Sequence, residues 1–402
     1  MKKLVVFASL TLAMVAHAER FDRSNDPENF NAVAVRPINK KFSDLPLKAK
    51  LRDERFGWSE SYWRADYGSI AYRWNDPMTQ WTNVIERGVE KPVPLRYKIL
   101  TKEEVMSMSE TEMEKLSPAE LYDIAMGDYH FPLTRKVLKM NSPNDLWWEG
   151  ICHGWSLAAA NYAEPARVTV TNKDGVRVPF GSSDVKGLMS LHDAYNSKGL
   201  YVRVGDRCSA IGKVPGEEYP EDGNIGTPSE RAANKDSCRD VNAGAFHAII
   251  GSMIGINSQG FVADIDRFND VWNQPAKGYN SEIVGEEAVN AQDEKNGIAK
   301  KIRIKTEFIY GDELEFYSEE SAHEGVIEFV SKDPVTGTPH QLDSSRQYEY
   351  VLELDSNGMI IGGEWISESR PDMLWMKRKD EKFRNGKFKL EGLNSIYKPR
   401  SL

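Results

Sequence analysis

From residue 243 onward, short runs of apolar residues recur along the chain, some continuous and some alternating with polar residues. Runs of four to eight such residues bounded by turn residues predict β-strands. Asp355-Ser-Asn-Gly358 predicts a tight turn between the last two runs. The predicted strands, which together predict an antiparallel sheet, are AFHAIIGSMIGI (245–256), FVADIDRF (261–268), KIRIKTEFIY (301–310), GVIEFV (325–330), YEYVLELD (348–355) and MIIGGEWI (359–366).

Helix signals lie before this strand-rich region. Thr101 and Glu104 have the spacing of a capping box, and Ser117 precedes a second amphipathic stretch. A third predicted helix begins at Cys152 and continues through three consecutive alanines. It ends before Pro165, because a proline cannot continue a helix.

Helices followed by a sheet predict an α+β fold. In this chain a helix that begins at a lone cysteine comes before the antiparallel sheet. This order of elements is typical of a papain-like cysteine enzyme. Residues 19–95 are polar and rich in proline, which predicts an N-terminal extension, a candidate pro-segment, in front of a catalytic domain over 96–402. The extension has aromatic residues that could anchor it to the main body, namely Trp58, Trp63, Trp74 and Trp81.

The first 18 residues have the pattern of a secretory signal peptide. Lys2 and Lys3 precede an apolar run, and Ala16-His17-Ala18 is a small-residue cleavage site. No other stretch is apolar over 18 residues, so we expect an exported, periplasmic or secreted protein that is not integral to a membrane. Without the two lysines the net charge falls from −9 to −11, and an acidic chain disfavours nucleic acid as a partner.

The three cysteines fall into two groups. Cys208 and Cys238 flank 29 residues rich in Gly, Pro, Ser and acidic side chains. In an oxidising compartment, a disulfide between them would stabilise the fold by roughly 3–4 kcal/mol on the chain-entropy model. Cys152 is then the odd cysteine, which in an exported protein is either intermolecular or reactive.

Cys152 is the predicted nucleophile. The positive end of the helix dipole lowers the pKa of a thiol at a helix N-terminus. A thiolate also needs a histidine and an acid that orients it. His247 interrupts an otherwise apolar run, and Asp264 and Asp266 interrupt the next one, which predicts that the two runs meet. The spacing leaves both acids open as the partner of His247.

Two other features compete with this assignment. Gly154-Trp-Ser156-Leu-Ala158 approaches a nucleophile elbow but lacks its second glycine. His153 adjoins Cys152, yet neighbours on a first helical turn point in different directions. The other histidines of the mature chain, His130, His192, His323 and His340, lie in polar or loop-like contexts.

WWEGICHGWSLAAA (147–160) and VWNQPAKGY (271–279) together resemble the transglutaminase elicitor family. The resemblance implies acyl transfer between a protein glutamine and a lysine or small amine. It implies Cys152 as the nucleophile, His247 as the base and Asp264 ahead of Asp266 as the acid. The sequence itself requires no cofactor, but the resemblance implies calcium dependence, with no ligands assigned.

The predicted chemistry forms a thioester on Cys152, which an amine must reach before water does. Bulky side chains near the cysteine could exclude water, and the candidates for this channel are Trp147, Trp148, Trp155 and Trp272. A cysteine protease or glutamine deamidase would use the same three groups. A non-enzymatic surface protein, with VWNQP as an interaction epitope, is the third hypothesis.

Overall fold

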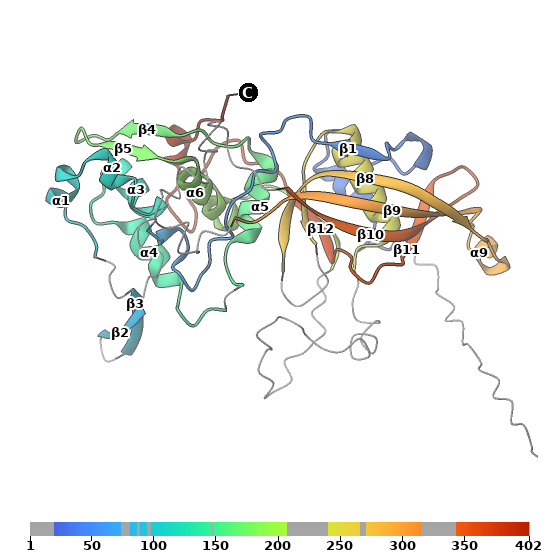
Figure 1. Ribbon diagram of the computed structural model, residues 1–402, viewed down its shortest axis with the longest axis horizontal. Coiled ribbons are helices and arrows are strands. Elements are labelled where there is room, and N and C mark those ends of the chain that lie inside the picture. The colour runs from blue at the N-terminus through green and yellow to red at the C-terminus, as the bar shows by residue number, and fades with distance from the viewer. Residues whose placement is uncertain are drawn as a thin grey trace, which may run out of the picture.

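The computed structural model describes two lobes joined near the middle of the molecule, a helical one and one built on a long sheet (Figure 1). In the described part of the chain, no helix is long and apolar enough to cross a membrane. The predictions made for residues 1–19 and for 325–330 lie outside this part. The described residues are 20–73, 81–86, 89–94, 98–146, 148–206, 240–265, 271–314 and 343–401.

The main sheet has the strand order β11-β10-β9-β8-β7-β12-β6, and β1 pairs with β8 off this path. Every pair in it is antiparallel. The predicted strands over 301–310, 348–355 and 359–366 are thus confirmed. The strands are β1 (Lys48–Lys50), β6 (Tyr201–Gly205), β7 (Val262–Asp264), β8 (Asn273–Glu287), β9 (Lys300–Gly311), β10 (Asp343–Leu354), β11 (Ile360–Trp365) and β12 (Met373–Lys377).

The helical lobe contains the predicted capped helices. Thr101 accepts a hydrogen bond from the Glu104 N–H, and Ser117 accepts one from the Glu120 N–H, each within a complete capping box. The elements of this lobe are α1 (Lys102–Ser107), α2 (Glu110–Met113), α3 (Pro118–Ala125), α4 (Pro132–Met140), α5 (Cys152–Asn161), α6 (Ser182–Tyr195), α12 (Leu393–Ile396) and the hairpins β2 (Trp81–Glu86) with β3 (Val89–Pro94) and β4 (Val168–Thr171) with β5 (Arg177–Phe180).

The remaining elements border the sheet. Short 3-10 helices lie at η1 (Pro27–Ala32), η2 (Phe42–Asp44) and η3 (Ser69–Ala71), and α9 (Ala291–Lys295) connects two of the long strands. Helix α5 belongs to both lobes. Trp155 and Ala158 pack in the core of the helical lobe, whereas Leu157 and Ala160 pack in the core of the sheet lobe.

The strand predicted over 245–256 is wrong. The chain forms helix α8 (Ala243–Ile250), which continues as a π-helical turn, η4 (Gly251–Ile256). The Asn242 side chain caps α8 by accepting from the Gly244 and Ala245 N–H groups. All eight residues of α8 are buried, and a helix buried on every side has no polar stripe to reveal its period.

Residues 20–73 are built into both lobes. Trp58 and Trp63 are 0% and 1% exposed. The Trp58 indole donates to the Tyr162 carbonyl at 3.0 Å, and β1 adds a strand to the main sheet. A Cβ on Gly187 of α6 would lie 2.7 Å from the Trp63 ring, so this glycine makes room for it. These two tryptophans therefore act as anchors, and the role of the segment as a pro-segment stays a prediction.

Candidate active site

Cys152 is the first residue of α5, as predicted. The turn before it is tightly packed, because a Cβ on Gly150 would lie 2.4 Å from the Tyr62 carbonyl oxygen. The Ile151 N–H donates to that same carbonyl at 2.7 Å. Gly154 allows α5 to approach α6 closely, since a Cβ there would lie 2.1 Å from the Ser190 carbonyl oxygen. These contacts fix the position of the first turn of α5 and therefore the position of the Cys152 thiol.

The thiol lies in a cleft of about 560 Å³. The Cys152 Sγ donates to the Val271 carbonyl at 3.6 Å and accepts from Asn273 Nδ2 at 3.7 Å. The Asn273 Oδ1 accepts from the Trp375 indole at 2.7 Å, which holds the amide in this orientation. The side chains that line the cleft include Asp145, Trp148, Cys152, His153, Arg203 and Asn273.

The electrostatics of the thiol differ from those predicted. Burial raises the pKa of Cys152 to about 12. The Glu313 and Asp264 carboxylates add to this rise, because negative charge nearby disfavours a thiolate. The side-chain and backbone N–H groups of Asn273 oppose it. The thiol of the free protein is therefore neutral at pH 7.

Asp264 is buried at the end of β7, where it is paired in register with Asn273 of β8 and Met373 of β12. Its Oδ1 accepts from the Trp272 N–H at 3.0 Å. The structure thus brings Asp264 to the strands that border Cys152. Asp266, the other predicted acid, lies outside the described residues.

The structure places His247 in α8, with no described contact to Cys152 or Asp264. Its Nδ1 shares a hydrogen bond of 2.8 Å with the Tyr350 hydroxyl, and its ring lies 5.7 Å from that of Phe42. Nε2 has no hydrogen-bond partner among the described residues. Burial lowers the pKa of His247 to about 4. The predicted meeting of this histidine with Asp264 depended on two adjacent strands, and the first of them is a helix.

The other predicted site residues have different environments. Trp148 lines the cleft, whereas Trp155 is 0% exposed and donates to the Trp58 carbonyl at 3.1 Å, so it is a core residue. Trp272 is half-buried and packs edge-on against Tyr62. The Ser156 hydroxyl donates to the Cys152 carbonyl at 2.8 Å. The predicted disulfide between the other two cysteines and the position of Trp147 lie outside the described residues.

Three groups near the thiol were not predicted. His153 lines the cleft, and its ring packs edge-on against Tyr195 at 6.2 Å. Asn273 is part of the VWNQP motif. The motif drew attention to this residue but did not indicate its contact with the thiol. No sequence pattern indicated Glu313. Burial raises the pKa of its carboxyl to about 8, and Gln274 Nε2 donates to it at 3.5 Å.

The calcium dependence implied by the resemblance has no matching ligand cluster in the described ranges. They contain no group of three or more His, Cys, Asp or Glu side chains placed to hold a metal ion. Calcium needs six to eight oxygen ligands, most often with several carboxylates among them.

Comparisons with known proteins agree with the fold of helices and an antiparallel sheet. The crystal structure of the GP42 transglutaminase from Phytophthora sojae has a similar fold, with a TM-score of 0.60 and 19% sequence identity over 94% of this chain and 98% of that one. No curated protein matches the chain. The family described as Transglutaminase elicitor matches residues 28–385. The chain therefore belongs to the transglutaminase elicitor family.

Proposed function

We propose that the protein is a transglutaminase that joins protein glutamine to lysine or another primary amine through a thioester on Cys152. The observation that carries the proposal is the contact between Asn273 of the VWNQP motif and the Cys152 sulfur at the N-terminus of α5. The sulfur and a hydrogen-bond donor lie together in one cleft, which supports Cys152 as the nucleophile. We also propose export through residues 1–18 and protein substrates outside the cytoplasm.

In the first half of the reaction, the Cys152 sulfur attacks the carbonyl carbon of a glutamine γ-carboxamide. A C–S bond forms, the C–N bond breaks, and the nitrogen leaves as ammonia with the thiol proton. The first N–H groups of a helix have no carbonyl partner within it, so those of α5 can stabilise the oxyanion. The Asn273 Nδ2, which faces the sulfur, is a further donor.

The proton that passes from sulfur to nitrogen needs a carrier that faces the cleft. His247 is the carrier predicted from the sequence, but its described contacts lead to Tyr350 and Phe42. His153 is the histidine that lines the cleft beside Cys152. Asp264 is the acid predicted to orient His247; its described bond is to the Trp272 N–H, which supports a different role, the positioning of the VWNQP strand beside Cys152.

The decisive assay incubates purified protein with a fluorescent primary amine and a glutamine-rich protein, and measures both amine incorporation and ammonia release. Cys152→Ala should abolish both. Ser156→Ala should retain both, because that hydroxyl is bound to a helix carbonyl. Ammonia release without incorporation would indicate a deamidase, and peptide cleavage lost with Cys152 would indicate a protease. No activity in any form would favour the non-enzymatic hypothesis.

A further inference from the structure

A second, smaller cavity of about 280 Å³ adjoins the cleft that contains Cys152. Three residues line both cavities, namely His153, Asn273 and Met373. The smaller cavity does not include Cys152 in its lining. The smaller cavity therefore opens into the cleft beside Cys152, at the residues that the two linings share.

This arrangement matters once the thioester has formed. The acyl group is then bound to Cys152 and, with the protein that carries it, occupies the larger cleft. A second substrate needs another route to the same carbonyl carbon. We propose that the smaller cavity, hereafter the acceptor arm, admits the alkyl chain of a primary amine, and that His153 at the junction accepts the proton of that amine. This inference rests on the proposed function.

The walls of the acceptor arm suit an alkyl chain. Leu157 of α5, Tyr201 of β6 and Trp375 of β12 contribute apolar surface. The Tyr201 and Trp375 rings lie 5.8 Å apart. A lysine side chain has four methylene groups, and the removal of each one from water favours binding. A glutamine side chain has only two methylenes and a carboxamide that requires hydrogen bonds. The walls therefore favour the amine substrate.

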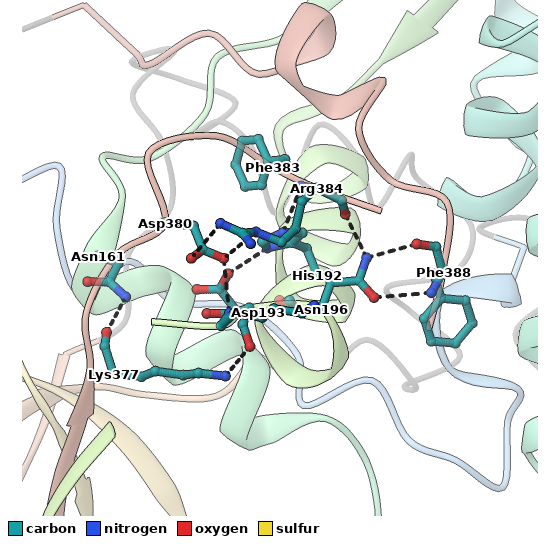
Figure 2. A network of polar contacts seen from close by, with 12 residues as sticks. Asn161, His192, Asp193, Asn196, Lys377, Asp380, Phe383, Arg384 and Phe388 are labelled. Carbon is teal, nitrogen blue, oxygen red and sulfur yellow. Dashed lines mark hydrogen bonds and ion pairs between the residues drawn. The ribbon is translucent and has the colours of Figure 1, made fainter. Parts of the chain in front are cut away.

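Two charged residues also line the acceptor arm, and both already have partners. The Asp193 Oδ1 is 2.8 Å from His192 Nδ1, and the Arg384 N–H donates to the other ring nitrogen at 3.1 Å (Figure 2). The Lys377 ammonium donates to the Ser197 carbonyl. These bonds hold α6 and the end of β12 together around the cavity. Both side chains are thus held by bonds to the surrounding chain, and the apolar walls determine which alkyl chain the acceptor arm accepts.

His153 is suited to the proton transfer. Burial lowers its pKa, and the nearby Lys377 ammonium adds to the effect, so the ring is neutral at pH 7. The amine nitrogen attacks the thioester carbon, a C–N bond forms and the C–S bond breaks. The proton lost by the nitrogen passes to His153 and then to the Cys152 thiolate. The products are the isopeptide and the free thiol, so the enzyme returns to its initial state.

The cavity is tested with Tyr201→Ala and with Ala194→Leu, which narrows the acceptor arm from α6. Both should raise the KM of a dansylated pentylamine by roughly three- to tenfold. The KM of hydroxylamine, which has no alkyl chain, should change much less. Leu200→Ala is the matched control, because Leu200 is 52% exposed, adjoins Tyr201 and lies outside both linings.

The proton transfer is tested with His153→Gln, a neutral side chain of similar size. It should lower kcat for the alkylamine with little change in its KM. Partial recovery is expected at alkaline pH, where more of the amine is already unprotonated. Unchanged kcat and an unchanged pH profile would overturn the role of His153. A purely structural role would instead lower the melting temperature and all rates together.

The outcomes separate the two proposals. If wild-type protein releases no ammonia from a glutamine peptide, the proposed function fails and the acceptor arm fails with it. If ammonia is released and both Tyr201→Ala and Ala194→Leu leave the alkylamine KM unchanged, only the acceptor arm is overturned. Circular dichroism and thermal melting of each variant establish that it is folded before its kinetics are compared.

Discussion

The Asn273 amide and the Cys152 sulfur lie 3.7 Å apart, although 121 residues separate them in the sequence. The amide nitrogen points at the sulfur because its oxygen is bound to the Trp375 indole. The side chain therefore presents a hydrogen-bond donor to the sulfur. In the proposed acyl transfer, this contact is the chemical role of the VWNQP motif inside the cleft.

Asn273→Ala should lower the rate of ammonia release by about 10²- to 10³-fold, the usual effect of removing one oxyanion donor. Trp375→Phe is the matched control, since it removes the indole N–H that orients the amide but keeps the amide itself. Trp375→Phe should lower the rate of ammonia release by a smaller factor than Asn273→Ala. Steady-state ammonia release from a glutamine peptide measures both. Equal losses would show that packing around Trp375, and not the amide, is responsible.

The reactivity of Cys152 toward iodoacetamide should keep rising up to about pH 12, the raised pKa of its thiol. An ordinary thiol with a pKa near 8.5 levels off much earlier. Glu313→Gln should accelerate alkylation only above about pH 8, where the wild-type carboxyl becomes ionised and opposes the thiolate. Mass spectrometry of the Cys152 peptide gives the rates. Acceleration by Glu313→Gln at pH 6 would contradict this explanation.

His247 should make the fold sensitive to acid. Its pKa is about 4 in the folded state against 6.5 for the ordinary group, so the unfolded chain binds more protons in that interval. This contribution to stability is full above pH 6.5 and declines as the pH falls to about 4, by about 3 kcal/mol in all. His247→Gln should flatten the decline, as measured by urea unfolding at several pH values.

The same variant tests the catalytic role predicted for His247 from the sequence. A base that carries the proton between sulfur and nitrogen contributes at least about 10²-fold to the rate. A folded His247→Gln protein that keeps most of its turnover would contradict that role. Loss of turnover in folded His247→Gln, with His153→Gln active, would support it.

Trp63→Ala should destabilise the fold by about 3–5 kcal/mol, because the ring is fully buried beside Gly187. Trp148→Ala should destabilise the fold by less, because Trp148 lies in the wall of the cleft. Denaturant unfolding measures both. Deletion of residues 19–95 should accordingly prevent folding. A soluble deletion protein with higher turnover would instead support the predicted pro-segment.

Local patterns were sufficient where neighbouring residues determine the structure. The capping boxes at Thr101 and Ser117 satisfy orphan N–H groups within one turn, so their helices were predictable. Strand β9 shows alternation because one of its faces is partly solvated. Cys152 at the start of a helix followed from the alanines after it and from Pro165.

Tertiary structure determined the rest. Helix α8 is apolar on every side, so its period is invisible in the sequence, and its capping by Asn242 and its packing against β11 make it a helix. The surroundings of Cys152 depend on which strands lie next to β7, and the register of β8 and β12 brings Asn273 and Met373 there. The sequence by itself determined where the helix that begins at Cys152 starts, through local signals, and made Cys152 the predicted nucleophile. Only long-range pairing decided which donors, acids and histidine surround the thiol, because no local interaction specifies contacts between residues so far apart in the chain.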